Sequence, residues 1–170
     1  MMKRIARFEK VSRDIFEKAF ISCLADREYS DEIYDTVVMP RRATEGSAGY
    51  DFHAPVDFTL APGEMVTIPT GIRAKIADGW VLMIYPRSGL GFKFRLQLNN
   101  TVGIIDSDYY NSDNEGHIMI KLTNDSREGK TLSLSKGDAF AQGVFSEFGI
   151  TEDDCATTKR NGGFGSTDKI

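Results

Sequence analysis

The sequence predicts an all-β domain, a jelly-roll-like antiparallel β-barrel preceded by a helix and followed by a flexible polar arm. Three observations support this prediction. From Thr36 onward, short runs rich in β-branched and aromatic residues are separated by proline and glycine turns. No helical periodicity intervenes between these runs, which favours antiparallel over parallel strands. The length of 170 residues suits one domain with a substantial core.

The strands are predicted where apolar, β-branched and aromatic residues cluster. The runs are Thr36–Met39, Glu64–Ile68, Ile72–Ile76, Trp80–Tyr85, Ile118–Leu122, Thr131–Leu134 and Ala139–Phe148. The turn signals among them are Pro40, Pro55, Pro62–Gly63, Pro69–Gly71 and Asp78–Gly79. Because proline lacks a backbone N–H and glycine tolerates turn conformations, each of these positions favours the end of a strand.

Residues 12–25 are predicted to form a helix before the sheet. Ser12 is a suitable N-cap, and Asp14 stands in the first turn. The apolar residues of this segment fall on one stripe: Ile15, Phe16, Ala19, Phe20, Cys23 and Leu24. An acidic stretch from Asp26 to Asp35 then separates the helix from the strands.

The chain therefore divides into three segments. Residues 1–32 form the helical extension, residues 33–148 the β-barrel core and residues 149–170 a C-terminal arm. From about residue 157 the arm is polar, rich in glycine and too poor in apolar residues to pack unaided, so we expect it to be mobile.

Composition excludes several classes of function. The net charge of −4 argues against a broad nucleic-acid-binding surface. Cys23, Cys155, His53 and His117 lack ligand spacing, so neither a zinc site nor a disulfide framework is predicted. No run approaches the roughly 18 apolar residues of a membrane-spanning helix, and no apolar run follows the basic N-terminus. We expect a cytoplasmic protein that binds neither nucleic acid nor membrane.

Two glycine-containing segments suit a backbone that approaches a ligand closely. In residues 46–52, Gly-Ser-Ala-Gly-Tyr-Asp-Phe, small residues lead into a strand that carries Asp51; a structural turn is the simpler interpretation. In residues 85–91, Tyr-Pro-Arg-Ser-Gly-Leu-Gly, the guanidinium of Arg87 lies beside a hydroxyl and two glycines, which is typical of a phosphate cradle. A glycine turn with a solvated arginine fits this second segment equally well.

Two later segments carry an acid and an aromatic ring. In residues 100–109 an apolar run ends at Asp106, where a carboxylate at the exit of a buried strand can act as a general base. A hairpin whose acids face solvent is the alternative. In residues 159–167, Lys-Arg-Asn-Gly-Gly-Phe-Gly-Ser-Thr, Phe164 has no structural purpose in a polar arm, so we expect it to stack on a ligand when the arm closes.

Together these segments indicate an enzyme acting on a small polyphosphate. Their order and content resemble the trimeric, all-β dUTPase family across residues 36–167. Residues 136–142, Lys-Gly-Asp-Ala-Phe-Ala-Gln, resemble the fourth motif of that family, which makes five motifs in order. The resemblance implies hydrolysis of dUTP to dUMP and pyrophosphate with Mg²⁺, by water attack on the α-phosphorus. It also implies a homotrimer with shared active sites. The reaction keeps uracil out of DNA and supplies dUMP for dTMP synthesis.

The resemblance also implies roles for individual residues. Asp106 would deprotonate the attacking water, and Asp51 would be an outer-shell partner of an Mg²⁺ ion held mainly by the phosphates. The residues implied to contact the phosphate chain are Arg87, Ser88, Gly89 and Gln142. The residues implied to read uracil and deoxyribose are Asn100, Gly103, Ile105 and Tyr109. The residues implied to close the site from the arm are Arg160, Phe164, Gly165, Ser166 and Thr167, with Lys159 as the substitute for Arg160.

Departures from the family pattern leave other functions open. Residues 110–116, Tyr-Asn-Ser-Asp-Asn-Glu-Gly, form a longer loop than usual, and Gly89 stands where many members carry serine. A regulatory protein could dock on this loop or on the 12–25 helix, which would make the chain a dUTPase-fold binding protein. Deamination of dCTP on the same fold is a further alternative. We expect instead that the helix covers an open sheet face and that the loop is solvated.

Overall fold

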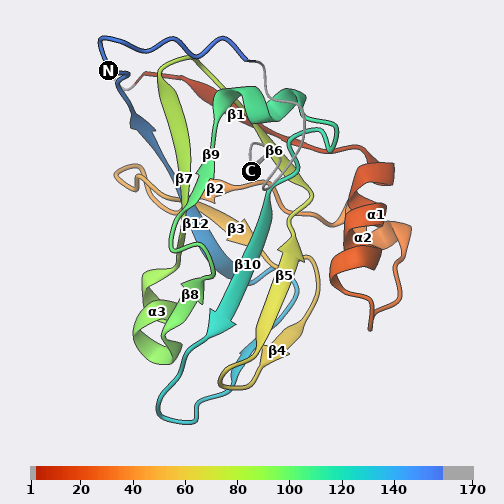
Figure 1. Ribbon diagram of the computed structural model, residues 1–170. Helices are drawn as coiled ribbons and strands as arrows, with labels where there is room; N and C mark the ends of the chain where they lie inside the picture. The colour runs from red at the N-terminus through yellow and green to blue at the C-terminus, as the bar shows by residue number, and fades with distance from the viewer. Residues whose placement is uncertain (1–2, 159–170) are drawn as a thin grey trace.

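The computed structural model describes residues 3–158. Its strands are β1 (Ala6–Lys10), β2 (Arg41–Arg42), β3 (Tyr50–His53), β4 (Phe58–Leu60), β5 (Met65–Pro69), β6 (Ile72–Ile76), β7 (Trp80–Pro86), β8 (Leu96–Leu98), β9 (Gly103–Ile105), β10 (Met119–Asn124), β11 (Leu132–Leu134) and β12 (Ala139–Glu147). Its helices are α1 (Arg13–Cys23), α2 (Asp31–Asp35), α3 (Ser88–Phe94) and the 3₁₀ helix η1 (Ser107–Asn111). The elements are arranged as Figure 1 shows.

Within the described residues the strands form four sheets, and every pairing is antiparallel. The largest has the order β2-β3-β12-β7-β9 and the next β5-β10-β8. The two-stranded sheets are β1-β6 and β11-β4. The predicted all-β class and the antiparallel pairing are therefore confirmed, and six of the seven predicted runs coincide with strands β5, β6, β7, β10, β11 and β12.

The central strand β12 pairs with the whole length of β7, from Ala141 opposite Pro86 to Glu147 opposite Trp80. Gly143 lies in the middle of β12, where an added Cβ would come within 2.8 Å of the Leu82 side chain. The absence of a side chain at this position lets the strand lie close to the core.

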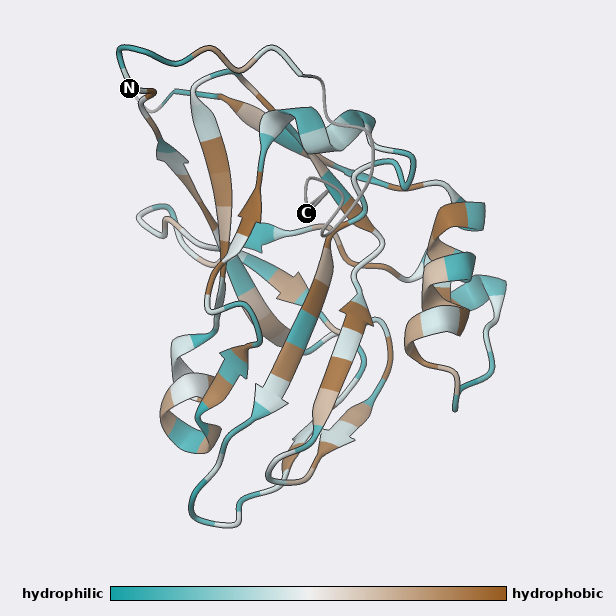
Figure 2. Ribbon diagram, in the orientation of Figure 1, coloured by the Kyte–Doolittle hydropathy of each residue, from teal (hydrophilic) through white to brown (hydrophobic). Residues whose placement is uncertain are grey.

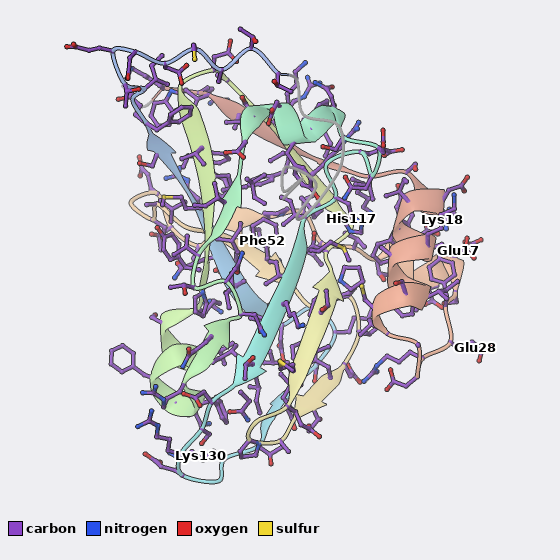
Figure 3. The ribbon with its side chains drawn as sticks, in the orientation of Figure 1. Glu17, Lys18, Glu28, Phe52, His117 and Lys130 are labelled. Atoms are coloured by element: carbon purple, nitrogen blue, oxygen red, sulfur yellow. The ribbon has the colours of Figure 1, made fainter. Side chains whose placement is uncertain are left out.

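The core is filled by large aliphatic and aromatic side chains from all four sheets. The largest fully buried ones are Phe16, Phe20, Phe52, Phe140, Ile68, Ile72, Leu82, Ile84, Leu96, Ile118, Ile120 and Leu122. Strand β10 shows the pattern that produces this core, with Ile120 and Leu122 buried and Lys121 between them exposed, an alternation that Figure 2 displays. Phe52 lies among the strands in Figure 3.

The predicted helix is confirmed as α1. The Ser12 hydroxyl accepts a hydrogen bond from the Ile15 N–H at 3.4 Å, as an N-cap does, and Phe16 and Phe20 are fully buried. The helix packs against β5, as expected for a cover on a sheet, and Lys18 points outward in Figure 3. No helix among residues 3–158 is both long and apolar enough to cross a membrane.

One predicted strand was wrong, and the elements α2, α3 and β1 were not predicted. The run Thr36–Met39 is not a strand, because the Val37 N–H is bonded to the Tyr34 carbonyl at the end of α2, a helix in the acidic stretch that was not predicted. Residues 88–94, for which the sequence left a phosphate cradle and a glycine turn open, form helix α3, which was not predicted. Strand β1 was not predicted either; it pairs with β6 from Ala6 opposite Ile76 to Lys10 opposite Ile72.

Candidate active site

Four polar side chains form a transverse row on the largest sheet. Arg41 pairs with Asp51, Asp51 with Gln142, and Gln142 with Tyr85, so the row crosses β2, β3, β12 and β7. Because directly opposed residues of antiparallel strands share one face, these side chains lie on the same side of the sheet. Two of them, Asp51 and Gln142, are residues that the sequence implicated.

Arg87 joins this row from the end of β7. Its Nε atom lies 3.3 Å from Oδ1 of Asp51, with side-chain exposures of 44% and 18%. Gln142 donates through Nε2 to the Pro86 carbonyl at 3.3 Å. A Cβ at Gly49 would lie only 2.6 Å from Oε1 of Gln142, so glycine leaves the space that this amide occupies. The structure therefore brings together Asp51, Arg87 and Gln142, three residues from distant parts of the sequence.

Two adjoining cavities surround this group. The first, of about 490 Å³, is lined by Arg41, Arg42, Ala43, Asp51, His53, Arg87, Gly137, Asp138 and Ala139. The second, of about 350 Å³, is lined by Arg87, Ser88, Gly89, Leu90, Leu134, Asp138 and Ala139. Ser88 and Gly89 are exposed and open α3, so their backbone N–H groups lie in the first turn, where no helical carbonyl precedes them. This surface suits a polyanion.

Sequence reasoning missed three residues of this surface. Arg41 and His53 line the first cavity, and burial lowers the pKa of His53, with Arg41 and Arg87 also lowering it and Asp51 raising it. Arg42 holds the 46–52 segment in place by donating to the carbonyls of Glu45 at 2.6 Å and Ser47 at 3.0 Å. The register of β2 against β3 sets these positions, and a two-residue strand gives no periodic signal by which to find it.

A second group of implicated residues lies around β9. Gly103 packs against β7, where a Cβ would come within 3.1 Å of the Ile84 side chain, and Ile105 is buried. Asn100 is exposed in the turn before this strand, and the next residue, Thr101, has φ 65°, a conformation that a β-branched residue adopts only under constraint. Asp106 follows the strand directly, at the N-terminus of η1.

Tyr109 is held tightly in this second group. The residue is 4% exposed, and its hydroxyl donates to the His117 carbonyl at 2.8 Å. The same hydroxyl accepts a hydrogen bond from Nδ2 of Asn114 at 2.8 Å. The orientation of the ring is therefore fixed from its hydroxyl end.

The two groups lie at opposite ends of the sheet. Strand β9 runs antiparallel to β7, with Ile105 opposite Leu82 and Gly103 opposite Ile84. Arg87 is thus five positions along β7 from the partner of Ile105, a separation of roughly 16 Å at ~3.3 Å per residue. Helices α3 and η1 lie at opposite ends of the molecule in Figure 1. Arg87 directly precedes α3, and Asp106 directly precedes η1. One chain does not bring the implicated base and the phosphate cradle together.

The implicated arm residues Arg160, Phe164, Gly165, Ser166 and Thr167, with Lys159, lie outside the described residues. Among residues 3–158 no group of three or more His, Cys, Asp and Glu side chains is arranged to hold a metal ion. A larger depression of about 620 Å³, between the end of α1 and strands β4 and β5, contains none of the implicated residues. The chemistry of the two polar groups, and not the size of that depression, identifies the candidate site.

The chain is similar in sequence and in fold to known proteins of one family. The dUTPase family model matches residues 35–168. The deoxyuridine 5′-triphosphate nucleotidohydrolase of Lactococcus lactis is 46% identical over 132 residues, which cover 76% of this chain and 87% of the relative. The dUTPase structure from Streptococcus mutans superimposes with a TM-score of 0.62 at 34% identity, covering 85% of this chain and 98% of that chain. A dUTPase from phage phi11 of S. aureus, at 20% identity and a TM-score of 0.63, covering 91% of this chain and 98% of that chain, shares the fold. The chain belongs to the dUTPase family.

Proposed function

We propose that three copies of this chain hydrolyse dUTP to dUMP and pyrophosphate at sites built between them. The main support for this proposal is the separation of roughly 16 Å between Arg87 and the end of β9. Asp106 follows that end, at the N-terminus of η1. At this separation we expect a phosphate group held by Arg87 to lie beyond hydrogen-bond reach of Asp106 in the same chain. A closed ring of identical chains would place the β9 end of one beside the cradle of the next. The relatives are named deoxyuridine 5′-triphosphate nucleotidohydrolases, which favours hydrolysis of dUTP. We therefore do not propose deamination of dCTP.

Exposed apolar side chains near both groups support such an assembly. Phe92 on α3 is 93% exposed, and Ile104 on the edge strand β9 is 47% exposed. Phe148 and Ile150, which follow β12, are exposed by 51% and 75%. Apolar side chains of this size at a sheet edge and beside the phosphate cradle are expected to be covered by a neighbouring copy.

In this site each residue has a physical task. Arg87, Ser88 and Gly89 would bind the phosphate chain, with Gln142 directed at an α-phosphate oxygen or the attacking water. From the neighbouring chain, Asp106 would accept the proton of that water as it attacks the α-phosphorus, and pyrophosphate would leave.

The neighbouring chain would also read the nucleoside. The turn around Asn100, with the backbone of Gly103 and Ile105, would contact uracil. Tyr109 would lie against the deoxyribose and leave no space for a 2′-hydroxyl. Residues of the arm, Phe164 above all, would cover the base and exclude bulk water.

The residues of the candidate site fit an Mg²⁺ ion held mainly by the substrate. Asp51 is a single carboxylate already paired with Arg87, which suits an outer-shell contact through water and not a protein cage. When bound, Mg²⁺ would neutralise charge on the phosphates. The phage phi11 enzyme is described with a structural Mg(II) ion.

The two cysteines, Cys23 and Cys155, are free thiols. Because thiols stay reduced in the cytoplasm, we place the protein there.

Mixing two inactive variants tests the shared site. Arg87→Ala removes the phosphate contact and Asp106→Asn removes the base, so each trimer alone should release little pyrophosphate from dUTP. When equal amounts are unfolded and refolded together, about a quarter of the sites receive an intact Arg87 from one chain and an intact Asp106 from another. The rate should therefore recover toward a quarter of the wild-type value.

Two controls make this result decisive. The same variants mixed without unfolding should stay inactive if chains do not exchange. Wild type refolded with an equal amount of Asp106→Asn should show about half of the wild-type rate per total chain. The wild type should release pyrophosphate from dUTP in preference to dCTP, dTTP and UTP. If it does so and the refolded mixtures of the two variants recover no activity, each site lies within one chain and the shared arrangement is wrong.

A further inference from the structure

The 110–116 loop, longer than is usual in the family, is only partly solvated, whereas a solvated loop was expected. Ser112 is 4% exposed, and Gly116 and His117 are buried. The expectation failed because Tyr110, Asn114 and Glu115 bind other parts of the chain, which a polar sequence does not reveal.

The loop is fastened to the N-terminal segment, defined as residues 6–12 and comprising β1, Val11 and Ser12. Oε2 of Glu115 accepts a hydrogen bond from the Ser12 N–H at 2.7 Å. The Tyr110 hydroxyl donates to Oε2 of Glu9 at 2.6 Å. Two separate bonds thus join the segment that precedes α1 to the end of η1 and the turn that follows it, more than a hundred residues apart in the sequence.

Arg73 on β6 reinforces this junction. Its Nη2 atom lies 3.1 Å from Oε2 of Glu9 and its Nη1 atom 4.0 Å from Oε2 of Glu115. Its guanidinium carbon also lies 4.3 Å from the centre of the Tyr110 ring. The side chains of Arg73, Glu9 and Glu115 are exposed by only 23%, 25% and 33%, so these contacts are shielded from solvent more than a surface ion pair is.

The loop is also fastened to Tyr109. Asn114 donates from Nδ2 to the Tyr109 hydroxyl at 2.8 Å, and its Oδ1 atom accepts from the Gly116 N–H at 3.1 Å. Glu115 has φ 57° and Gly116 φ 71°. A Cβ at Gly116 would lie 2.7 Å from the Tyr109 carbonyl oxygen, so the backbone can pass this close only with glycine there. The direction of the Asn114 side chain therefore depends on the turn that Glu115 holds against Ser12.

From these contacts we infer that the N-terminal segment and the 110–116 loop form a positioning device for Tyr109, with Asn114 and Glu115 as its specificity-determining residues. This inference rests on the proposed contact between Tyr109 and the deoxyribose. A 2′-hydroxyl can be accommodated only if the ring moves away, and such a movement breaks the Asn114 bond and strains the turn anchored at Ser12. The junction thus opposes acceptance of a ribonucleotide from a part of the chain that touches no substrate.

Steady-state hydrolysis of dUTP and UTP by loop variants of the full-length protein tests the inference. Asn114→Ala should raise KM for dUTP and raise the kcat/KM of UTP relative to dUTP about fivefold to tenfold, the scale of one lost hydrogen bond. Glu115→Ala should do the same more weakly. Glu115→Gln keeps an oxygen acceptor for the Ser12 N–H and should restore most of the discrimination.

Asp113→Ala is the matched control. Asp113 is exposed in the same loop and carries the same charge as Glu115, so its removal should leave the preference for dUTP unchanged. Tyr110→Phe deletes only the hydroxyl that bonds to Glu9 and keeps the ring under Arg73, so it serves if Asn114→Ala does not fold. It should shift the dUTP preference by a smaller factor in the same direction.

The possible results separate this inference from the proposed function. If wild type prefers dUTP and the Asn114, Glu115 and Tyr110 variants keep that preference at wild-type level, the loop has no positioning role. The same holds if Asp113→Ala alters the preference as much as they do. If the wild type itself does not distinguish dUTP from UTP, the proposed contact between Tyr109 and the sugar fails first, and the inference falls with it.

Discussion

Acidification between pH 6.5 and pH 4 should destabilise this protein through one side chain, His117. The ring is 1% exposed, and its centre lies 6.1 Å from that of Phe16 on α1, between the helix and the sheet in Figure 3. Its Nε2 atom accepts a hydrogen bond from the Gly71 N–H at 2.8 Å, so this nitrogen carries no proton in the folded state. Protonation would add a buried charge and replace an acceptor by a second donor facing that N–H.

The magnitude follows from the two pKa values. Burial lowers the pKa of His117 to about 4 from its ordinary 6.5, although the charge of Glu115 acts to raise it. Between these values the unfolded chain binds a proton that the folded chain does not, so stability falls as the pH falls. The contribution is complete above pH 6.5, is reduced by about 2 kcal/mol per chain at pH 5, and is reduced by about 3 kcal/mol at pH 4.

Urea unfolding at pH 7.5 and pH 5, at one fixed protein concentration, measures this loss. His117→Gln retains an acceptor for the Gly71 N–H without a titratable ring and should lose much less stability between these pH values. The pKa values of Glu9 and Glu115 are lowered from 4.5, Glu9 mainly by the Tyr110 hydroxyl and Glu115 by its bond with Ser12 against the effect of burial. Their contributions are lost only below that value, so pH 5 isolates the histidines.

His53 provides the necessary control, because burial lowers its pKa as well. His53→Gln should remove a smaller part of the pH dependence, since this ring is only half-buried. The sequence contains two histidines, so an NMR titration of labelled imidazole resolves both directly. An equal loss of stability in wild type and His117→Gln, or a measured pKa of His117 near 6.5, would refute the reasoning.

Three further predictions concern the site. Asp106→Asn should lower kcat for dUTP at least ~100-fold with unchanged affinity for dUMP, measured by pyrophosphate release and calorimetry; near-normal turnover would remove the general-base role. Deleting residues 158–170 should collapse turnover while the mass of the assembly in light scattering still corresponds to three chains; dissociation would give the arm a structural role. Thr101→Gly should raise the free energy of unfolding by about 0.5 kcal/mol. The steric strain that threonine has at φ 65° is larger than the entropic cost of glycine. Destabilisation in urea would show instead that the Thr101 side chain stabilises the turn.

The sequence predicted the fold where each strand had its own periodic signal. Strands β6, β7 and β12 follow from local clusters of β-branched and aromatic residues. Strand β1, Ala-Arg-Phe-Glu-Lys, is mostly charged, and it forms because β6 offers it a partner far along the chain. The paired residues are between 62 (Lys10 and Ile72) and 70 (Ala6 and Ile76) positions apart in the sequence. Helix α3, Ser-Gly-Leu-Gly-Phe-Lys-Phe, has a sequence of low helix propensity, and its tertiary surroundings decide its conformation.

The candidate site shows the same limit. The sequence implicated Asp51, Arg87 and Gln142 separately, yet their assembly in one row depends on two long-range strand registers. The register of β9 against β7 likewise places Asp106 at the far end, which no local pattern reveals. The contact between Glu115 and Ser12 was missed because both residues are polar and each suits a solvated turn on its own.

The pairing of β1 with β6 has a consequence for how short this chain can be made. Strand β6 carries buried Ile72, Ala74 and Ile76 on one face, and β1 is the strand that pairs with its backbone in the described residues. A recombinant chain that began at residue 35, where the family match starts, would present these N–H and C=O groups as an open edge. Such an edge recruits strands from other molecules, so the shortened protein should aggregate. We therefore expect the first strand to protect the edge of β6 from such pairing, independently of any part it has in the reaction.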